Sequence, residues 1–338
     1  MKNKAFTVYV ILLFLAGAEI FTRLFVPDKV IAFKPSTNPR LVYELNPEYP
    51  GINSQGMRGP EIDLAHLSQK WVIAAIGDSH TYSSLVSDAA QSYPAQLEKE
   101  LNVRNVRKES KQDIAVLNFG VPGYNTATEL ELFKTKVLPL EPKLVLLQVT
   151  INDTHVCNYL NPEHPKLNRT LHQSAALVRT WRNILYSSFG RKFLIDFIGI
   201  HYPDLLLYRE GLVGTLKTLP TDSPERRAHP ARTPDRVPKR YHYMLGRENW
   251  ERALREFGEI AKQHGIRLMA TGFVKEEDRE LFQSAGFDVY SFYDIFQGLH
   301  TYDYGTYSDR RTSGHFNEAG CHWIASKLAD YIKTHYQS

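Results

Sequence analysis

Short apolar runs alternate with helix-like stretches along most of the chain. Five runs have the length and composition of strands, at residues 71–76, 113–119, 144–149, 267–270 and 289–292. Such continuous runs are typical of strands buried on both faces of a sheet. Helical patterns or helix-start signals lie between or after them, at residues 93–101, 126–137, 247–264, 276–284 and 317–338. The second of these is expected to begin at Thr126, which has capping-box spacing with Glu129. This alternation predicts a parallel sheet covered by helices on both sides.

Two stretches depart from the alternation. Residues 27–70 contain six prolines, so we expect an irregular lead-in before the body of the protein at residues 71–338. An insertion is predicted within that body at about residues 155–245. Its part at residues 220–240 holds five prolines, with six basic residues against three acidic ones. The insertion is interpreted either as a solvated loop or as a lid or partner-binding element beside the site.

The first 26 residues have the pattern of a membrane-targeting segment. Lys2 and Lys4 precede an uncharged stretch at residues 5–18, and apolar residues resume around Glu19 and Arg23. The segment can span a bilayer if these two charged side chains reach the headgroups. The basic N-terminus then stays inside, and the body is exported. We expect a single-pass helix in the cell inner membrane with a periplasmic body.

Two other interpretations of this segment stay open. Residues 16–18 read Ala-Gly-Ala, which resembles a signal-peptide cleavage site and would make the body a secreted protein. A helix buried in the core is the third possibility. Export would place Cys157 and Cys321 in an oxidising compartment, where they either form a disulfide or stay as two buried thiols.

Composition and charge exclude several classes of protein. With 43% hydrophobic and 23% charged residues, the chain is not disordered. A formal charge of +4 gives no case for a nucleic-acid partner, which would need a concentrated basic face. The mean hydropathy of −0.36 excludes a protein that crosses the membrane many times. Neither a Gly-x-x-x-x-Gly-Lys phosphate loop nor a His-Glu-x-x-His zinc helix is present, so no cofactor or metal is predicted.

Polar segments follow the first three predicted strands and precede the last helix. They are Gly77-Asp78-Ser79, the stretch from Gly120 to Gly123, Asn152-Asp153, and His315. Because ligands bind past the carboxyl ends of parallel strands, these segments are expected to converge on one crevice.

The residue types in these segments suit acyl transfer through a serine ester. Ser79 is the candidate nucleophile, and His315 is the candidate base that takes its proton. The backbone N–H groups of Ser79 and Gly123 and the side-chain amide of Asn152 are candidate donors of an oxyanion hole. His80 and His155 compete as bases, but neighbouring side chains of extended chain point apart, which disfavours His80.

These motifs resemble the SGNH hydrolase superfamily, also called GDSL-type esterases. Its four blocks match Gly77-Asp78-Ser79, Gly123, Asn152-Asp153 and His315, and residues 53–60, 92–97 and 120–126 resemble its bacterial membrane-anchored branch. The resemblance covers about residues 53–155 and 245–335. It implies a flavodoxin-like three-layer α/β/α sandwich and ester hydrolysis or O-acyl transfer without a metal, often on acetylated sugars.

One position departs from the family pattern. The family usually has an Asp two or three residues before the histidine, where this chain has Ser313 and Thr312. Asp309 lies six residues before His315 and is the candidate third member of the triad. Alternatively a backbone carbonyl orients the imidazole, or the site is weak or inactive. The missing Asp therefore motivates a second hypothesis, a degenerate domain that binds a glycan or an envelope partner. A third hypothesis, a lipid esterase, follows from the anchor and the tyrosine-rich insertion.

Overall fold

The computed structural model describes most of the chain. The described residues are 2–25, 32–104, 112–150, 152–157, 159–160, 216–217, 239–297, 308–309 and 314–336. Most of the predicted insertion at residues 155–245 therefore lies outside the described residues.

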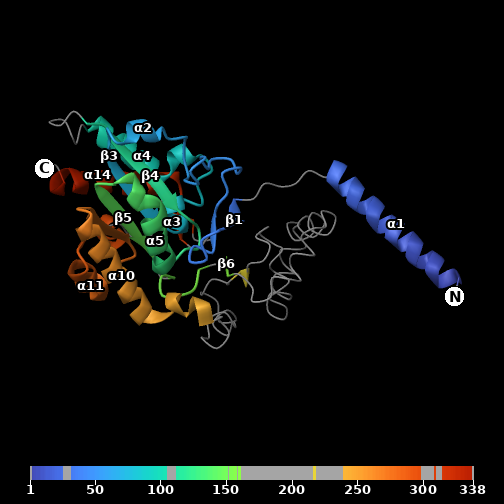
Figure 1. Cartoon of the computed structure of the whole chain (residues 1–338). Coiled ribbons are helices and arrows are strands. Elements are labelled where there is room, and N and C mark those ends of the chain that lie inside the picture. The colour runs from blue at the N-terminus through green and yellow to red at the C-terminus, as the bar shows by residue number, and fades with distance from the viewer. Residues whose placement is uncertain are drawn as a thin grey trace.

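A parallel five-stranded sheet forms the centre of the body (Figure 1). Its spatial order is β4-β3-β5-β8-β9, and every neighbouring pair is parallel. The strands are β3 (Trp71–Gly77), β4 (Ile114–Gly120), β5 (Leu144–Val149), β8 (Arg267–Gly272) and β9 (Phe287–Val289). Strands β3, β4 and β5 are buried at every residue, as their apolar runs predicted.

Helices cover both faces of this sheet, and alternate strand residues point to each layer. In β3, Val72, Ala74 and Ile76 pack into one core and Trp71, Ile73 and Ala75 into the other. The first core contains side chains of α5 (Thr126–Leu132), α10 (Gly246–Gln263) and α11 (Arg279–Ser284). The second contains those of α4 (Tyr93–Val103), α12 (Phe292–Ile295) and α14 (Glu318–His335). The predicted three-layer α/β/α sandwich is confirmed.

The lead-in packs onto the first of these cores. The antiparallel pair β1 (Phe33–Pro35) and β2 (Tyr43–Leu45) is followed by the short helix α2 (Leu64–Leu67). Tyr43 is completely buried, and its hydroxyl donates to the carbonyl of Pro122 at 2.9 Å. The lead-in thereby supports the loop that carries Gly123.

One predicted capping box and one predicted strand boundary are wrong. The helix begins at Thr126 as expected, but its capping box is formed by Asn125 and Thr128 and not by Thr126 and Glu129. Asn is a stronger N-cap than Thr, and its side chain accepts from the Thr128 N–H at 3.0 Å. The strand expected at residues 289–292 ends at Val289, because Ser291 caps α12 instead.

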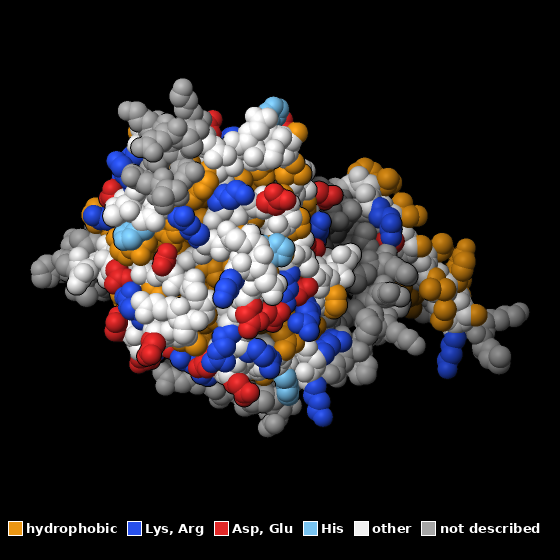
Figure 2. All heavy atoms as spheres, turned by 60° about the vertical axis from the view of Figure 1, so that its left-hand side comes forward, with side chains coloured by type: hydrophobic (Ala, Val, Ile, Leu, Met, Phe, Trp, Pro, Cys, Tyr) orange, Lys and Arg blue, Asp and Glu red, His pale blue; other side chains and the backbone are white. Residues whose placement is uncertain are grey.

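The N-terminal segment is one continuous helix, α1 (Lys2–Phe25), which extends away from the body in Figure 1. Its residues Lys4–Phe25 are long and apolar enough to cross a membrane. Large apolar side chains such as Phe14 and Leu24 are exposed along it, and Figure 2 shows hydrophobic side chains gathered there. Such a helix is either a membrane anchor or a signal sequence.

Candidate active site

The strand order reverses between β3 and β5. From β3 the chain passes to β4, which pairs with one edge of β3, and then to β5, which pairs with the other edge of β3. Such a reversal opens a crevice at the carboxyl ends of the two central strands. Ser79 follows β3 and Asn152 follows β5, so both lie at this position.

Ser79 begins the short helix α3 (Ser79–Tyr82) directly after β3. The turn is tight, because a Cβ on Gly77 would lie 2.3 Å from Thr81 Oγ1. Asp78 caps the helix, its side chain accepting from the N–H of His80 at 2.9 Å. A glycine and a capping carboxylate therefore hold the serine where strand turns to helix.

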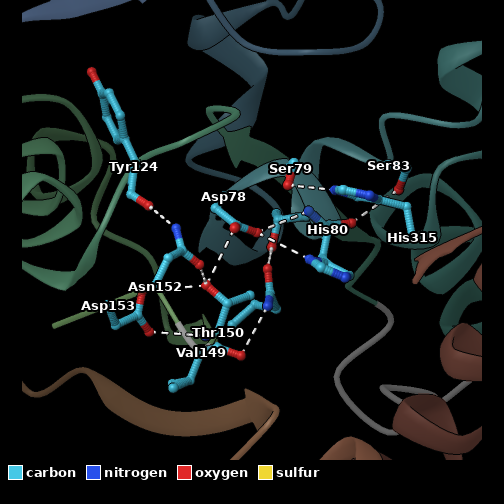
Figure 3. A network of polar contacts seen from close by, with 12 residues as sticks. Asp78, Ser79, His80, Ser83, Tyr124, Val149, Thr150, Asn152, Asp153 and His315 are labelled. Carbon is cyan, nitrogen blue, oxygen red and sulfur yellow. Dashed lines mark hydrogen bonds and ion pairs between the residues drawn. The ribbon is translucent and has the colours of Figure 1, made fainter. Parts of the chain in front are cut away.

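His315 reaches Ser79 from the far end of the chain. It lies in β11 (His315–Phe316), between the left-handed Gly314 and Asn317, the N-cap of α14. The Nε2 atom of His315 is 2.6 Å from Ser79 Oγ, within hydrogen-bond distance (Figure 3). The buried Phe316 next to it anchors the strand in the core. The structure thus brings together the two residues expected to act as nucleophile and base.

Asp78 links the serine turn to the loop after β5. One carboxylate oxygen accepts from the Thr150 hydroxyl at 3.2 Å, and the other accepts from the His80 backbone N–H and lies 3.3 Å from its Nδ1. Burial alone would raise the pKa of Asp78, but the hydrogen bonds and charge of His80 hold that pKa below its usual value. We therefore treat Asp78 as a buried anion that ties two site segments together.

Asn152 lies beside the loop that carries Gly123. Its Nδ2 donates to the carbonyl of Tyr124 at 3.2 Å, and its Oδ1 accepts from Thr150 (Figure 3). The amide has a second N–H for another acceptor. Gly123 has a φ of 80°, a left-handed conformation that other residues adopt at a cost. These contacts orient Asn152 and place its loop against the one that carries Gly123.

Two further carboxyl groups are buried behind the site. Glu129 on α5 is fully buried, and neither of its oxygens has a hydrogen-bond partner among the described residues. Burial raises the pKa of Glu129 well above its usual range, and the charge of Asp153 raises it further. Burial also raises the pKa of Asp153, although its carboxylate accepts from the Thr150 N–H at 2.9 Å. Sequence reasoning missed Glu129 as a buried group, because it had been placed in a capping box.

The other candidate histidines have different surroundings. His80 does not point at Ser79; its ring stacks on the ring of His315, with centroids 4.5 Å apart. The sequence argument against His80 assumes that this segment is extended. That argument is wrong, because residues 79–82 are helical. His155 follows Asn152, and its backbone carbonyl accepts from Asn125. Another histidine, His322, is exposed on α14 and does not compete as a base.

The backbone pairing of one short strand places Asp309, the candidate third residue of the triad. Asp309 lies in β10 (Ser308–Asp309), which pairs antiparallel with β11. Its register partner is His315, so the two residues are opposite each other across the pair. Cys157 and Cys321 are both buried and are not joined in a disulfide, so the structure has the alternative of two buried thiols. Among the described residues, no group of three or more His, Cys, Asp or Glu side chains could hold a metal ion.

No protein-family profile and no curated protein matches this chain. Solved structures that do match include an acetyl xylan esterase, at 12% identity and a TM-score of 0.40 over 77% of this chain and 99% of that one. A psychrotrophic esterase from Pseudoalteromonas sp. matches at 9% identity and 0.40, covering 78% and 98%. A proposed lipolytic protein of the G-D-S-L family from Desulfitobacterium hafniense matches at 11% and 0.33, covering 78% and 99%. Two of these three structures are named as esterases and one as a lipolytic protein.

Proposed function

We propose that this protein is a serine-dependent ester hydrolase or O-acyltransferase. The observation that carries the proposal is the 2.6 Å contact between Ser79 Oγ and His315 Nε2. A serine hydroxyl is a weak nucleophile unless a neighbouring base takes its proton. Here the base lies within hydrogen-bond distance, at the switch point of a parallel sheet where ligands bind.

The reaction would run in two steps through an acyl-serine. In the first, His315 Nε2 takes the proton of Ser79 while Oγ attacks the ester carbonyl, and His315 then returns that proton to the departing alkoxide oxygen. In the second, His315 deprotonates water or an acceptor alcohol, which attacks the acyl-serine, and His315 returns this proton to Ser79 Oγ as the ester bond to the serine breaks. Water yields an acid, and an alcohol yields a new ester.

Three N–H donors are proposed to stabilise the negative oxygen of the tetrahedral intermediate. They are the backbone N–H groups of Ser79 and Gly123 and the second N–H of Asn152. Support comes from the contact between Asn152 and the Tyr124 carbonyl, since it joins the Asn152 loop to the residue after Gly123. Each donor of this kind contributes roughly a hundredfold to a thousandfold in rate.

Asp309 is proposed to orient the His315 imidazole from the side away from Ser79. Support comes from the register of β10 and β11, in which the two residues are direct partners. A carboxylate at that position would fix the tautomer with the Nε2 lone pair toward the serine. The alternative is a Ser–His pair in which a backbone carbonyl accepts from the imidazole.

The proposed substrate is a short acyl ester on an envelope glycan. This follows from the motif resemblance and from the proposed location of the protein.

The helix α1 has 24 residues, which gives a length of about 36 Å and exceeds the roughly 30 Å hydrocarbon core of a bilayer. An uncleaved α1 would hold the body at the outer face of the inner membrane. Recovery of a chain that begins at Glu19 would instead indicate a secreted protein.

The deciding experiment compares the full-length protein with its Ser79→Ala variant in detergent. We expect the parent chain to hydrolyse p-nitrophenyl acetate and to be labelled by a fluorophosphonate, and the variant to do neither while keeping its melting temperature. Ser68→Ala, an exposed serine outside the site, is the matched control. A parent chain that is neither labelled nor active would support the degenerate binding domain. Faster hydrolysis of long-chain than of short-chain esters would support the lipid esterase.

A further inference from the structure

His80 and His315 form a stacked pair of imidazole rings at the proposed active site. Their centroids are 4.5 Å apart, and the ring planes differ by 17° (Figure 3). This separation is within the range of offset stacking between aromatic rings. His80 therefore covers one face of the ring whose Nε2 atom contacts Ser79.

The stacked position of His80 is held from several directions. Its backbone N–H donates to Asp78, and its Nδ1 lies 3.3 Å from the same carboxylate oxygen. The rings of Phe273 and Phe316 stand edge-on to it, with centroids at 5.3 and 5.7 Å. Its Nε2 is buried without a hydrogen-bond partner among the described residues, so that part of the ring makes packing contacts only. The imidazole of His80 is a fixed surface and not a mobile side chain.

The ring of His315 needs such a surface. It is only half buried, and a hydrogen bond to Ser79 restrains one atom of the ring but not its tilt. A stacked contact on one face restrains rotation about the bond that joins the imidazole ring to Cβ. Misplacing a reacting group by about 1 Å can lower the rate on the order of a hundredfold.

We infer that His80 is a positioning residue for His315, with its ring acting as a stacking platform that keeps Nε2 directed at Ser79. This inference rests on the proposed function of the pair. It assigns no proton transfer to His80, because the ring is stacked on that of His315 and its Nδ1 lies against Asp78. The contacts of Asp78 with His80 also hold the His80 ring in this position.

Three substitutions separate the platform from other roles. His80→Ala removes the ring, and His80→Asn removes it while keeping a polar group that can reach Asp78. His80→Phe keeps a flat ring but loses both ring nitrogens. His322→Ala, at an exposed position on α14, is the matched control for removing a histidine. Each full-length variant is assayed for p-nitrophenyl acetate hydrolysis, fluorophosphonate labelling and melting temperature.

A platform predicts a specific pattern of rates. We expect kcat and the labelling rate to fall roughly 10- to 100-fold in His80→Ala and His80→Asn, with KM within about twofold. His80→Phe should recover both rates to within about fivefold of the parent chain. A general loss of structure would not be rescued by Phe alone, nor would it leave KM unchanged.

Two results would overturn the inference while leaving the proposed function intact. One is parental rates in His80→Ala or, should that variant not fold, in His80→Asn. The other is a Phe variant as slow as the Asn variant, which would mean that polarity and not stacking is required. The proposed function fails separately, if Ser79→Ala keeps the parent's activity or if the parent chain is neither active nor labelled. The inference would then fall with it.

Discussion

Ser79 and His315 are 236 positions apart in the chain, and their Oγ and Nε2 atoms are 2.6 Å apart in space. Ser79 is fixed at the end of β3, and His315 is fixed by the buried Phe316 and the capped start of α14. The two sides of the site are therefore held by different parts of the core. Substitutions that move either side should lower the rate, even where they touch neither residue.

Asn152 should matter for the rate and little for substrate binding. We expect Asn152→Ala to lower kcat roughly 100- to 1,000-fold, because one donor to the oxyanion would be lost, with a much smaller change in KM. Steady-state kinetics with p-nitrophenyl acetate measure both. Asn46→Ala, in the lead-in, is the control. An Asn152→Ala variant with parental kcat would remove Asn152 from the proposed oxyanion hole.

Asp309 should be required if it orients His315. We expect Asp309→Asn to reduce kcat on the order of 1,000- to 10,000-fold, because an amide cannot select the productive tautomer. Asp303→Asn, at the other acidic residue upstream of the histidine, serves as the control. Parental activity in Asp309→Asn would favour a Ser–His pair oriented by a backbone carbonyl.

Gly120 should tolerate no side chain. A Cβ there would lie 2.2 Å from the backbone nitrogen of Tyr82 and 2.6 Å from the carbonyl carbon of Thr81, both in α3. We expect Gly120→Ala to displace α3, lowering the melting temperature by several degrees and kcat at least tenfold. Gly258→Ala is the matched control, because its Cβ would meet the Ala285 backbone oxygen at 1.9 Å, away from the site. That variant should lose stability without a comparable loss of kcat per folded molecule.

Glu129 should make stability depend on pH. Its pKa is raised in the folded protein, so the folded chain keeps a proton that the unfolded chain releases above about pH 4.3. The free energy of unfolding should therefore decrease as the pH rises from that value toward the folded pKa, by up to about 1.4 kcal/mol per pH unit. Glu129→Gln cannot ionise, so its stability relative to the parent chain should increase with pH.

Denaturant unfolding at several pH values between 5 and 8 measures this difference. Glu280→Gln, at an exposed position on α11, is the control and should leave the pH slope unchanged. Parallel pH profiles for Glu129→Gln and the parent chain would mean that Glu129 is ionised in the folded protein.

The sequence alone determined the layered fold and the position of the candidate site along it. Apolar runs mark buried strands because both faces of a parallel sheet are covered, and that signal is local. The carboxyl ends of such strands meet at one edge, so residues after different strands were expected to converge. Ser79 and His315 were predicted in this way, and the structure brings them into contact. Their catalytic roles, with those of Gly123, Asn152 and Asp309, stay predictions.

Only the tertiary structure decided what surrounds these residues. The stacking of His80 on His315 joins two distant segments and has no signal in either one. The burial of Glu129 was hidden for a related reason, since a charged residue in the first turn of a helix usually faces solvent. Such contacts depend on how the layers pack, and packing depends on side chains from the whole chain at once. A local pattern can therefore predict where the chemistry lies but not which neighbours orient it.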